Sequence, residues 1–290
     1  MNKEETLKRV HRIMTATGYS DSTHKSYHKW IARLFDHLYP VDSKDITLSD
    51  AQDYLLYLYE EKNPADGTYN QCVDALRYFF ATIQGIQYEG KQLSKRRIKV
   101  VQKNPIMPDQ ARLLVNECKD PMLKAAIALA FGCGLRISEV ANLKVKNVHR
   151  GSQTITVEDS KGNKTRTVNY SLSVGDIVND YLKIGIRKQG AYLEEEDYIF
   201  RKYKKPGDKL STSAIRVKFN QYLQTFDFHL PDQTFHGLRH AFATGLAEKN
   251  VSLLVIQKLM GHSSIATTAK YIHVPDKTIT TLPDLLKGDD

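Results

Sequence analysis

Apolar side chains recur with helical spacing in the first hundred residues. The clearest stripe falls at i, i+3, i+4, i+7, i+8 and i+11, and it consists of Tyr27, Trp30, Ile31, Leu34, Phe35 and Leu38. A second stripe with the same periodicity consists of Tyr69, Cys72, Val73, Leu76, Phe80 and Ile83. Each stripe predicts an amphipathic helix that buries one face.

Polar residues ahead of these stripes suggest where the helices begin. Ser22 is the candidate N-cap of the first helix, and Ser49-x-x-Gln52 and Thr68-x-x-Gln71 have the form of capping boxes. Residues 7–17 add a further helical segment. Residues 1–90 are therefore expected to form a four-helix domain.

The pattern after residue 105 is mixed. Residues 108–119 and 120–132 have helical periodicity, whereas residues 154–157 and 165–168 are short β-branched runs joined across Gly162-Asn163, which is a hairpin signal. Helices resume at Ser173. A domain over residues 105–290 with several helices and one small antiparallel sheet is expected, so the fold class is mainly α.

Two further helices are expected near the end of this second domain. Gly261 follows the helical segment Ser252 to Met260 and is a candidate C-cap. Ser263 or Ser264 then begins the helix that carries Tyr271.

The segment KQLSKRRIKVVQK, at 91–103, contains six Lys or Arg and no acidic residue, and it lies between a glycine-containing turn and Asn104-Pro105. It predicts an interdomain linker over residues 91–104. A basic run of this kind is commonly a solvated surface, but it could also contact DNA phosphates. The candidate DNA-binding residues within it are Lys95, Arg96, Arg97 and Lys99.

Composition narrows the possible partners and the compartment. The formal net charge of +9 indicates a polyanionic partner, either nucleic acid or an anionic membrane surface. The longest apolar stretch, residues 125–135, is much shorter than the about 20 residues that span a bilayer. Three widely spaced cysteines and a charged N-terminal segment indicate neither disulfides nor export. A cytoplasmic protein is expected.

Four segments carry side chains that could take part in catalysis or metal binding. Each of them also has an ordinary structural explanation. Arg136 and Glu139 have the spacing of a helix-surface ion pair, and a lysine beside a turn is commonly solvated. His236 and His240 lie four apart, as zinc ligands on a helix can, but the Glu of H-E-x-x-H and a third ligand are missing, so no metal is predicted.

The four segments together resemble the motif boxes of the tyrosine recombinases, a phage integrase-like family that includes the Xer-type enzymes. The matching runs are GLRISEV, SKGNKTRTV with its hairpin lysine, HGLRH, and GHSSIATTAKYIHV, which span residues 134–273 in this order. The four-helix domain and basic linker are similar to the family's SAM-like core DNA-binding domain and hinge.

The resemblance implies a role for each matching residue. Tyr271 is implied as the nucleophile, and the other catalytic positions are Arg136, Lys161, His236, Arg239 and His262. Glu139 matches the acidic residue that supports the first arginine, and His240 matches a histidine with a more structural role. Asp159-Ser160 stands where a glycine is more usual before the lysine, and Ala269-Lys270 replaces bulkier pairs, so Lys164 remains an alternative to Lys161.

The implied function is site-specific DNA recombination through a 3′-phosphotyrosine intermediate, by integration, excision or resolution. Its partners would be a duplex recombination site and three further copies of the chain, because exchange of two duplexes needs four active tyrosines. No cofactor is expected, since the chain has neither a Walker loop nor an acidic cluster for magnesium. The implied location is the cytoplasm, in association with the nucleoid.

Two alternatives remain open. One is a type IB topoisomerase-like enzyme that nicks and closes a single duplex with the same chemistry. The other is a DNA-binding protein with a silent catalytic fold, although every catalytic position of the motif set is filled.

Overall fold

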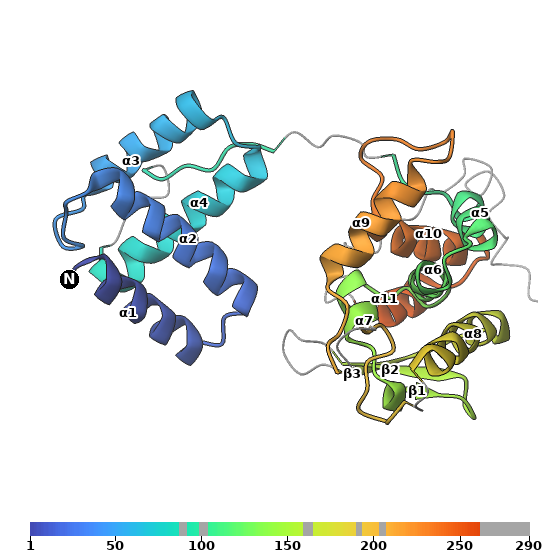
Figure 1. The fold of residues 1–290 in the computed structure, drawn as a ribbon. Helices are drawn as coiled ribbons and strands as arrows, with labels where there is room; N and C mark the ends of the chain where they lie inside the picture. Colours follow the sequence, from blue (N-terminus) through green and yellow to red (C-terminus); the bar gives the residue numbers. More distant parts are fainter. Residues whose placement is uncertain (87–91, 99–103, 159–164, 190–192, 203–206, 262–290) are drawn as a thin grey trace, which may run out of the picture. The chain divides into compact units, whose positions relative to one another are not determined.

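The computed structural model describes residues 1–86, 92–98, 104–158, 165–189, 193–202 and 207–261, with the side chains of 185–189 excepted. Figure 1 shows the ribbon, with the remaining segments as a thin trace. The chain divides into two compact units, Met1–Val101 and Gln102–Asp290. Each unit is described by itself below.

The N-terminal unit is built from four α-helices, as the sequence predicted (Figure 1). They are α1 (Lys3–Ala16), α2 (Asp21–Leu38), α3 (Leu48–Tyr57) and α4 (Asp66–Tyr78), and the last two continue as the π-helical segments η1 (Leu58–Lys62) and η2 (Phe79–Gln84). Both predicted stripes face a common core, in which Trp30, Leu34 and Leu76 are buried. The amphipathic patterns therefore determined this half of the fold.

The predicted starts of helices α2 and α4 were wrong. Ser20 rather than Ser22 caps α2, and its hydroxyl accepts the N–H of Thr23. Helix α4 begins at Asp66, so Thr68 lies inside its first turn, and the N-cap Ala65 has no capping side chain. Any of several adjacent polar residues can cap the start of a helix. The residue that does so has an extended backbone, as Ser20 has.

The predicted capping box of helix α3, Ser49-x-x-Gln52, was also wrong. Thr47 is the N-cap, its hydroxyl accepts the N–H of Asp50, and the Asp50 carboxylate accepts the N–H of Thr47 at 2.7 Å. Asp50 therefore takes the position of the usual Glu or Gln in a box that begins two residues earlier.

Residues 92–98, part of the segment assigned to a linker, pack on the helices of the N-terminal unit. Leu93 is fully buried in that unit's core, and its carbonyl accepts hydrogen bonds from the guanidinium of Arg77. The Asn70 side chain accepts the N–H of Arg96 at 2.8 Å and donates to its carbonyl at 3.0 Å. The chain is thus anchored on the helices at least as far as Arg96.

The second unit combines helices with one three-stranded sheet. The antiparallel strands β1 (Val148–His149), β2 (Thr154–Glu158) and β3 (Thr165–Asn169) lie in the order β1-β2-β3, with Ile155 opposite Val168. The predicted hairpin pairing is confirmed, and β1 is a strand that was not predicted. The helices are α5 (Pro108–Glu117), α6 (Pro121–Cys133), α7 (Ile137–Asn142), α8 (Leu172–Gln189), α9 (Thr212–Leu223), α10 (Phe235–Glu248) and α11 (Leu253–Met260), with a 3₁₀ turn, η3, at Val145–Asn147.

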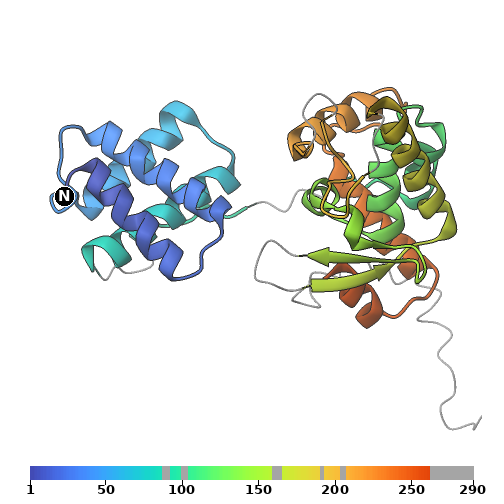
Figure 2. The same cartoon turned by 60° about the horizontal axis from the view of Figure 1, so that its bottom comes forward.

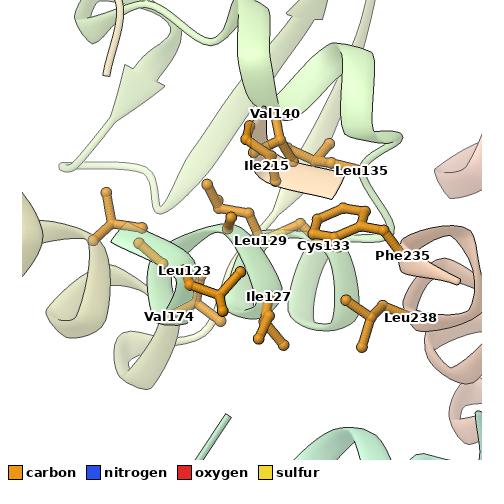
Figure 3. Close-up of a cluster of buried hydrophobic side chains, with 14 of the residues drawn as sticks. Leu123, Ile127, Leu129, Cys133, Leu135, Val140, Val174, Ile215, Phe235 and Leu238 are labelled. Carbon is orange, nitrogen blue, oxygen red and sulfur yellow. The ribbon is translucent and has the colours of Figure 1, made fainter. Parts of the chain in front are cut away.

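Helix α6 is the central element of this unit, and it is buried on nearly all sides. Figure 3 shows Ile127, Leu129 and Cys133 of this helix among side chains from the surrounding elements, and Figure 2 shows the sheet beside the helices. The apolar run at 125–135 is therefore a core helix and the start of the following loop. No helix in the described ranges is long and apolar enough to cross a membrane.

The same core fixes the two segments that carry the predicted arginines. Leu135 and Val140 are buried on either side of Arg136, and Phe235 and Leu238 are buried within the first turn of α10, beside Arg239 (Figure 3). Because these apolar neighbours are held in a close-packed core, the backbone that presents each arginine has little freedom to move.

Candidate active site

A buried carboxylate lies at the centre of the predicted site. Gly134 ends helix α6 in the left-handed conformation, with φ +67°, and Arg136 becomes the N-cap of α7. Glu139, the third residue of α7, has a side chain that is only 6% exposed. Its carboxylate accepts the backbone N–H of Arg136 and the Nη1 of the same residue, each at 2.8 Å.

Arg239 approaches the same carboxylate from another element. It lies on helix α10 and is 1% exposed, and its Nη1 is 3.7 Å from Oε2 of Glu139. Its guanidinium donates to the carbonyls of Gly134, the C-cap of α6, and of Met260, the last residue of α11. The structure thus brings Arg136, Glu139 and Arg239 together, although 105 positions separate Gly134 from Arg239 in the chain.

A third arginine, Arg166 on strand β3, was not predicted. Its Nη1 and Nη2 donate to Oε1 and Oε2 of Glu139, each at 2.8 Å, and its Nε donates to the carbonyl of Leu259 at 3.0 Å. One signal could have found it. Arg166 is two residues before the buried Val168, so strand alternation places it on the inner face, where an arginine requires a partner.

The electrostatic environment keeps Glu139 ionised. Burial alone would raise the pKa of this carboxyl, but the hydrogen bonds and charge of Arg166, and then of Arg136, outweigh burial and lower the pKa to about 2. A fully ionised carboxylate therefore holds the surrounding guanidiniums in fixed orientations near neutral pH.

The histidines of the HGLRH run are on helix α10, one turn from each other. The ring centroids of His236 and His240 are 4.7 Å apart in an edge-to-face arrangement. His236 is exposed and His240 is half-buried. In the described part of the chain, no group of three His, Cys, Asp or Glu side chains is placed to hold a metal ion.

The remaining predicted catalytic residues lie outside the described residues. These are Lys161 and its alternative Lys164 in segment 159–164, and His262 and Tyr271 in segment 262–290. Their roles stay predictions. The described strands β2 and β3 lead into and out of the lysine segment, and Gly261, with φ +60°, ends α11 directly before His262.

The candidate DNA-binding residues of the basic segment differ in their contacts. Lys95 forms an ion pair with Asp74 at 2.7 Å. The Arg96 guanidinium carbon lies 4.7 and 4.0 Å from the ring centroids of Tyr59 and Tyr69. Arg97 is exposed, and Lys99 lies outside the described residues. Arg97 is therefore the described residue of this group that is best placed for a phosphate contact.

Comparisons with known proteins identify the family of the chain. Residues 105–278 match the model of the phage integrase family, and residues 6–89 match the phage integrase N-terminal SAM-like domain. The tyrosine recombinase XerA of Pyrococcus horikoshii is 28% identical over 261 residues, which cover 90% of this chain and 86% of that protein. A putative integrase/recombinase of Sinorhizobium fredii is 30% identical, covering 78% and 86%.

Solved structures share the fold at low sequence identity. The Tn1549 transposon integrase in complex with transposon right-end DNA has a TM-score of 0.71 at 19% identity, covering 97% of this chain and 98% of that one. The lambda integrase tetramer bound to a Holliday junction has a TM-score of 0.70 at 19% identity, covering 93% and 77%. Several proteins similar to this chain are named tyrosine recombinases. Because the family model matches more than half of the sequence, the chain belongs to the phage integrase family.

Proposed function

We propose that this protein is a site-specific DNA recombinase that cleaves and rejoins strands through a 3′-phosphotyrosine at Tyr271. One observation carries the proposal beyond family membership. Arg136 and Arg239, from two distant parts of the chain, meet at one buried carboxylate, Glu139. Paired guanidiniums of this kind are suited to the non-bridging oxygens of a phosphodiester.

The arginines would stabilise the transition state rather than the resting phosphate. Attack by a phenolate on a phosphodiester gives a five-coordinate phosphorus with nearly two negative charges, which two guanidiniums can neutralise. An arginine keeps its positive charge at any relevant pH, and its planar fork matches two phosphate oxygens. Arg136, with a side chain 34% exposed, is accessible to such a ligand in the described structure.

Proton transfer would be divided among the other predicted residues. A tyrosine has a pKa near 10, so the attacking hydroxyl of Tyr271 needs a base, and the exposed His236 on helix α10 is the candidate. The departing 5′ oxygen needs a proton, for which Lys161 is the candidate acid and Lys164 the alternative. His262 would donate a hydrogen bond to the phosphate.

We further propose that residues 1–90 form a DNA-binding domain and 105–290 the catalytic domain, joined by the basic segment 91–104, which is anchored on the N-terminal helices as far as Arg96. The net charge of +9 suits a polyanionic partner, and the Tn1549 and lambda integrases that share this fold were solved in complex with DNA, which identifies DNA as the candidate. A tetramer on two duplexes follows from the need for four tyrosines, as in the lambda integrase tetramer on a Holliday junction. Action on chromosomal DNA would place the protein in the cytoplasm, at the nucleoid.

A covalent trap tests the proposal. DNA duplexes that carry the recombination site would be selected from a random-sequence pool by covalent capture, and then nicked so that cleavage is irreversible. The wild-type chain should form a covalent adduct that survives denaturing electrophoresis, and Tyr271→Phe should bind the same duplex without an adduct. An adduct formed by Tyr271→Phe would refute the assignment of the nucleophile.

The same assay separates the two alternatives. A type IB topoisomerase-like enzyme would form adducts on many sequences and relax a supercoiled plasmid as a monomer, whereas a recombinase would exchange strands between two copies of one site. A silent DNA-binding protein would form no adduct at all.

A further inference from the structure

Glu139 has more positive partners than one carboxylate can neutralise. Three guanidiniums face it, those of Arg136 from the start of α7, Arg166 from β3 and Arg239 from α10. The adjoining pocket, of about 500 Å³, is also lined by Lys144 and Glu158. Lys144 is paired with Glu196 at 2.7 Å, and Glu158 accepts a hydrogen bond from Asn147, so these two groups are engaged elsewhere.

The three arginines do not share the carboxylate equally. Arg166 takes both oxygens in a bidentate fork, with its side chain only 13% exposed. Arg136 makes one side-chain bond, to Oε1, and remains 34% exposed, while Arg239 stays 3.7 Å away. The arginine with the strongest hold on Glu139 is therefore the one that the predicted mechanism does not use.

The position of Arg166 is fixed from two further directions. Its Nε donates to the carbonyl of Leu259 in the last turn of α11. Gly261 lies against the same side chain, because a Cβ on this glycine would be 3.0 Å from Cδ of Arg166. The side chain thus connects β3 with the end of α11, and it has little room to adopt another rotamer.

We infer that Arg166 is a positioning residue that neutralises Glu139, so that the carboxylate does not offset the positive charges that Arg136 and Arg239 present to the DNA phosphate. Three guanidiniums and one carboxylate carry a net charge of +2, and without Arg166 the same group carries +1. Without the Arg166 fork, Glu139 would also be free to take Arg136 as its bidentate partner, which would turn that guanidinium away from DNA. The inference rests on the proposed recombinase function.

The test compares charge-changing variants in single-turnover cleavage of the nicked duplex described above. The variants are Arg166→Gln, Glu139→Gln and the double variant, with Arg201→Gln as matched control. Arg201 is also a buried arginine of this unit, 8% exposed, and is paired with Asp197 at 3.2 Å outside the candidate site. Cleavage rates are corrected for the folded fraction measured by thermal unfolding.

Arg166→Gln should lower the cleavage rate about 10- to 100-fold, which is the usual loss when a partner of a site residue is removed. Arg201→Gln should cleave at the wild-type rate once the folded fraction is taken into account. The double variant should cleave at least about tenfold faster than Arg166→Gln, because removal of the carboxylate charge returns the group to +2. If Arg166 only stabilised the fold, the double variant should cleave no faster than Arg166→Gln, because the loss of a second charged residue would disturb the cluster further.

The pH profile provides a second readout that a purely structural role would not affect. Without Arg166, burial should leave the pKa of Glu139 higher than in the wild type. On acidification the carboxyl of the variant should therefore become protonated at a higher pH than that of the wild type, and this should raise the rate of Arg166→Gln relative to the wild type. In the Glu139→Gln background this relative gain should be absent.

Each outcome has a distinct meaning. Wild-type cleavage by Arg166→Gln, or a double variant no faster than Arg166→Gln, would overturn the role of Arg166 and leave the recombinase function standing. A wild-type chain that captures no duplex covalently from the random-sequence pool would remove the proposed function, and with it this inference.

Discussion

At the residue scale, the neighbouring arginines of the basic segment have different surroundings. The Arg96 guanidinium lies over the rings of Tyr59 and Tyr69, donates to the carbonyl of Pro64 at 3.1 Å and lies 3.5 Å from a carboxylate oxygen of Asp66. Arg97 is exposed. Cation–π contacts and hydrogen bonds stabilise a fold, whereas an exposed guanidinium is available to phosphate.

The two arginines should therefore respond differently to alanine substitution. Arg97→Ala should weaken binding to all duplexes and reduce the slope of log K against log salt by about 1, because one phosphate contact is lost. Arg96→Ala should lower the stability of the N-terminal unit by about 1–2 kcal/mol, since its stacking and hydrogen bonds are lost. Fluorescence anisotropy at several salt concentrations and urea unfolding measure the two effects. An unchanged salt slope for Arg97→Ala would contradict the phosphate contact.

Glu139 gives the stability of the catalytic unit a specific pH dependence. The pKa of this carboxyl is about 2 in the folded chain, compared with 4.5 for an ordinary glutamate. A lowered pKa contributes stability above the unfolded pKa, and that stability is lost as pH falls through the folded one. The corresponding window is about pH 5 to 2, and the contribution at neutral pH is about 3 kcal/mol.

Urea unfolding of the wild type and of Glu139→Gln at a series of pH values checks this expectation. The difference between the two free energies of unfolding should shrink as the pH falls from 5 to 2, because the wild-type carboxylate becomes protonated. A difference that stays constant across this range would show that the charge of Glu139 contributes nothing to stability.

At the element scale, the turn between α6 and α7 places the first arginine. Gly134 has φ +67°, and a Cβ there would lie 2.6 Å from Cδ1 of Phe242. The carbonyl of the same residue accepts a hydrogen bond from Arg239. Only glycine satisfies both the left-handed backbone and the close approach of the phenyl ring.

Gly134→Ala should be markedly more destabilising than Gly207→Ala in the same unit. Gly207 also has a positive φ, of +94°, but nothing lies within 4 Å of its added Cβ. The control carries only the backbone strain, about 1–2 kcal/mol, while Gly134→Ala adds about 1–3 kcal/mol for the displaced ring. Thermal unfolding of both variants measures the difference, and equal losses would show that Phe242 moves aside freely.

At the scale of the whole molecule, assembly on DNA is the property to test. Ile279, Leu282, Leu285 and Leu286 have the spacing of an apolar helix face, and they lie outside the described residues. This segment can bind one of two surfaces, either a neighbouring copy of the chain or its own catalytic domain. In the first case the segment would couple the active sites of a tetramer.

Deletion of residues 277–290 distinguishes binding to a neighbouring copy from binding to the same chain. If the segment binds a neighbour, the shortened chain should bind a single site with wild-type affinity and fail to pair two sites. Native gels with one and with two labelled duplexes would measure both properties. Synapsis at the wild-type level would instead indicate that the segment folds back on its own domain.

The sequence by itself determined most of the elements and the family of this protein. Helical and strand periodicities located both cores and the hairpin, because burial of a face imposes a repeat of 3.6 or 2 residues. The motif runs identified the family and named Arg136, Glu139 and Arg239, which the structure brings together. Local polar signals were less informative, and the starts of α2, α3 and α4 fell on other residues than predicted.

Only the tertiary structure decided how Glu139 is shared and what each basic residue contacts. Arg166 is 27 positions from Glu139 and had no predicted role, yet it donates hydrogen bonds to both carboxylate oxygens. Arg96 and Arg97 are adjacent and chemically identical, but one is anchored on the helices and the other is exposed. Periodicity reports which face of an element is buried. The partner of a buried charge depends on which distant element packs there, and this is decided by long-range packing.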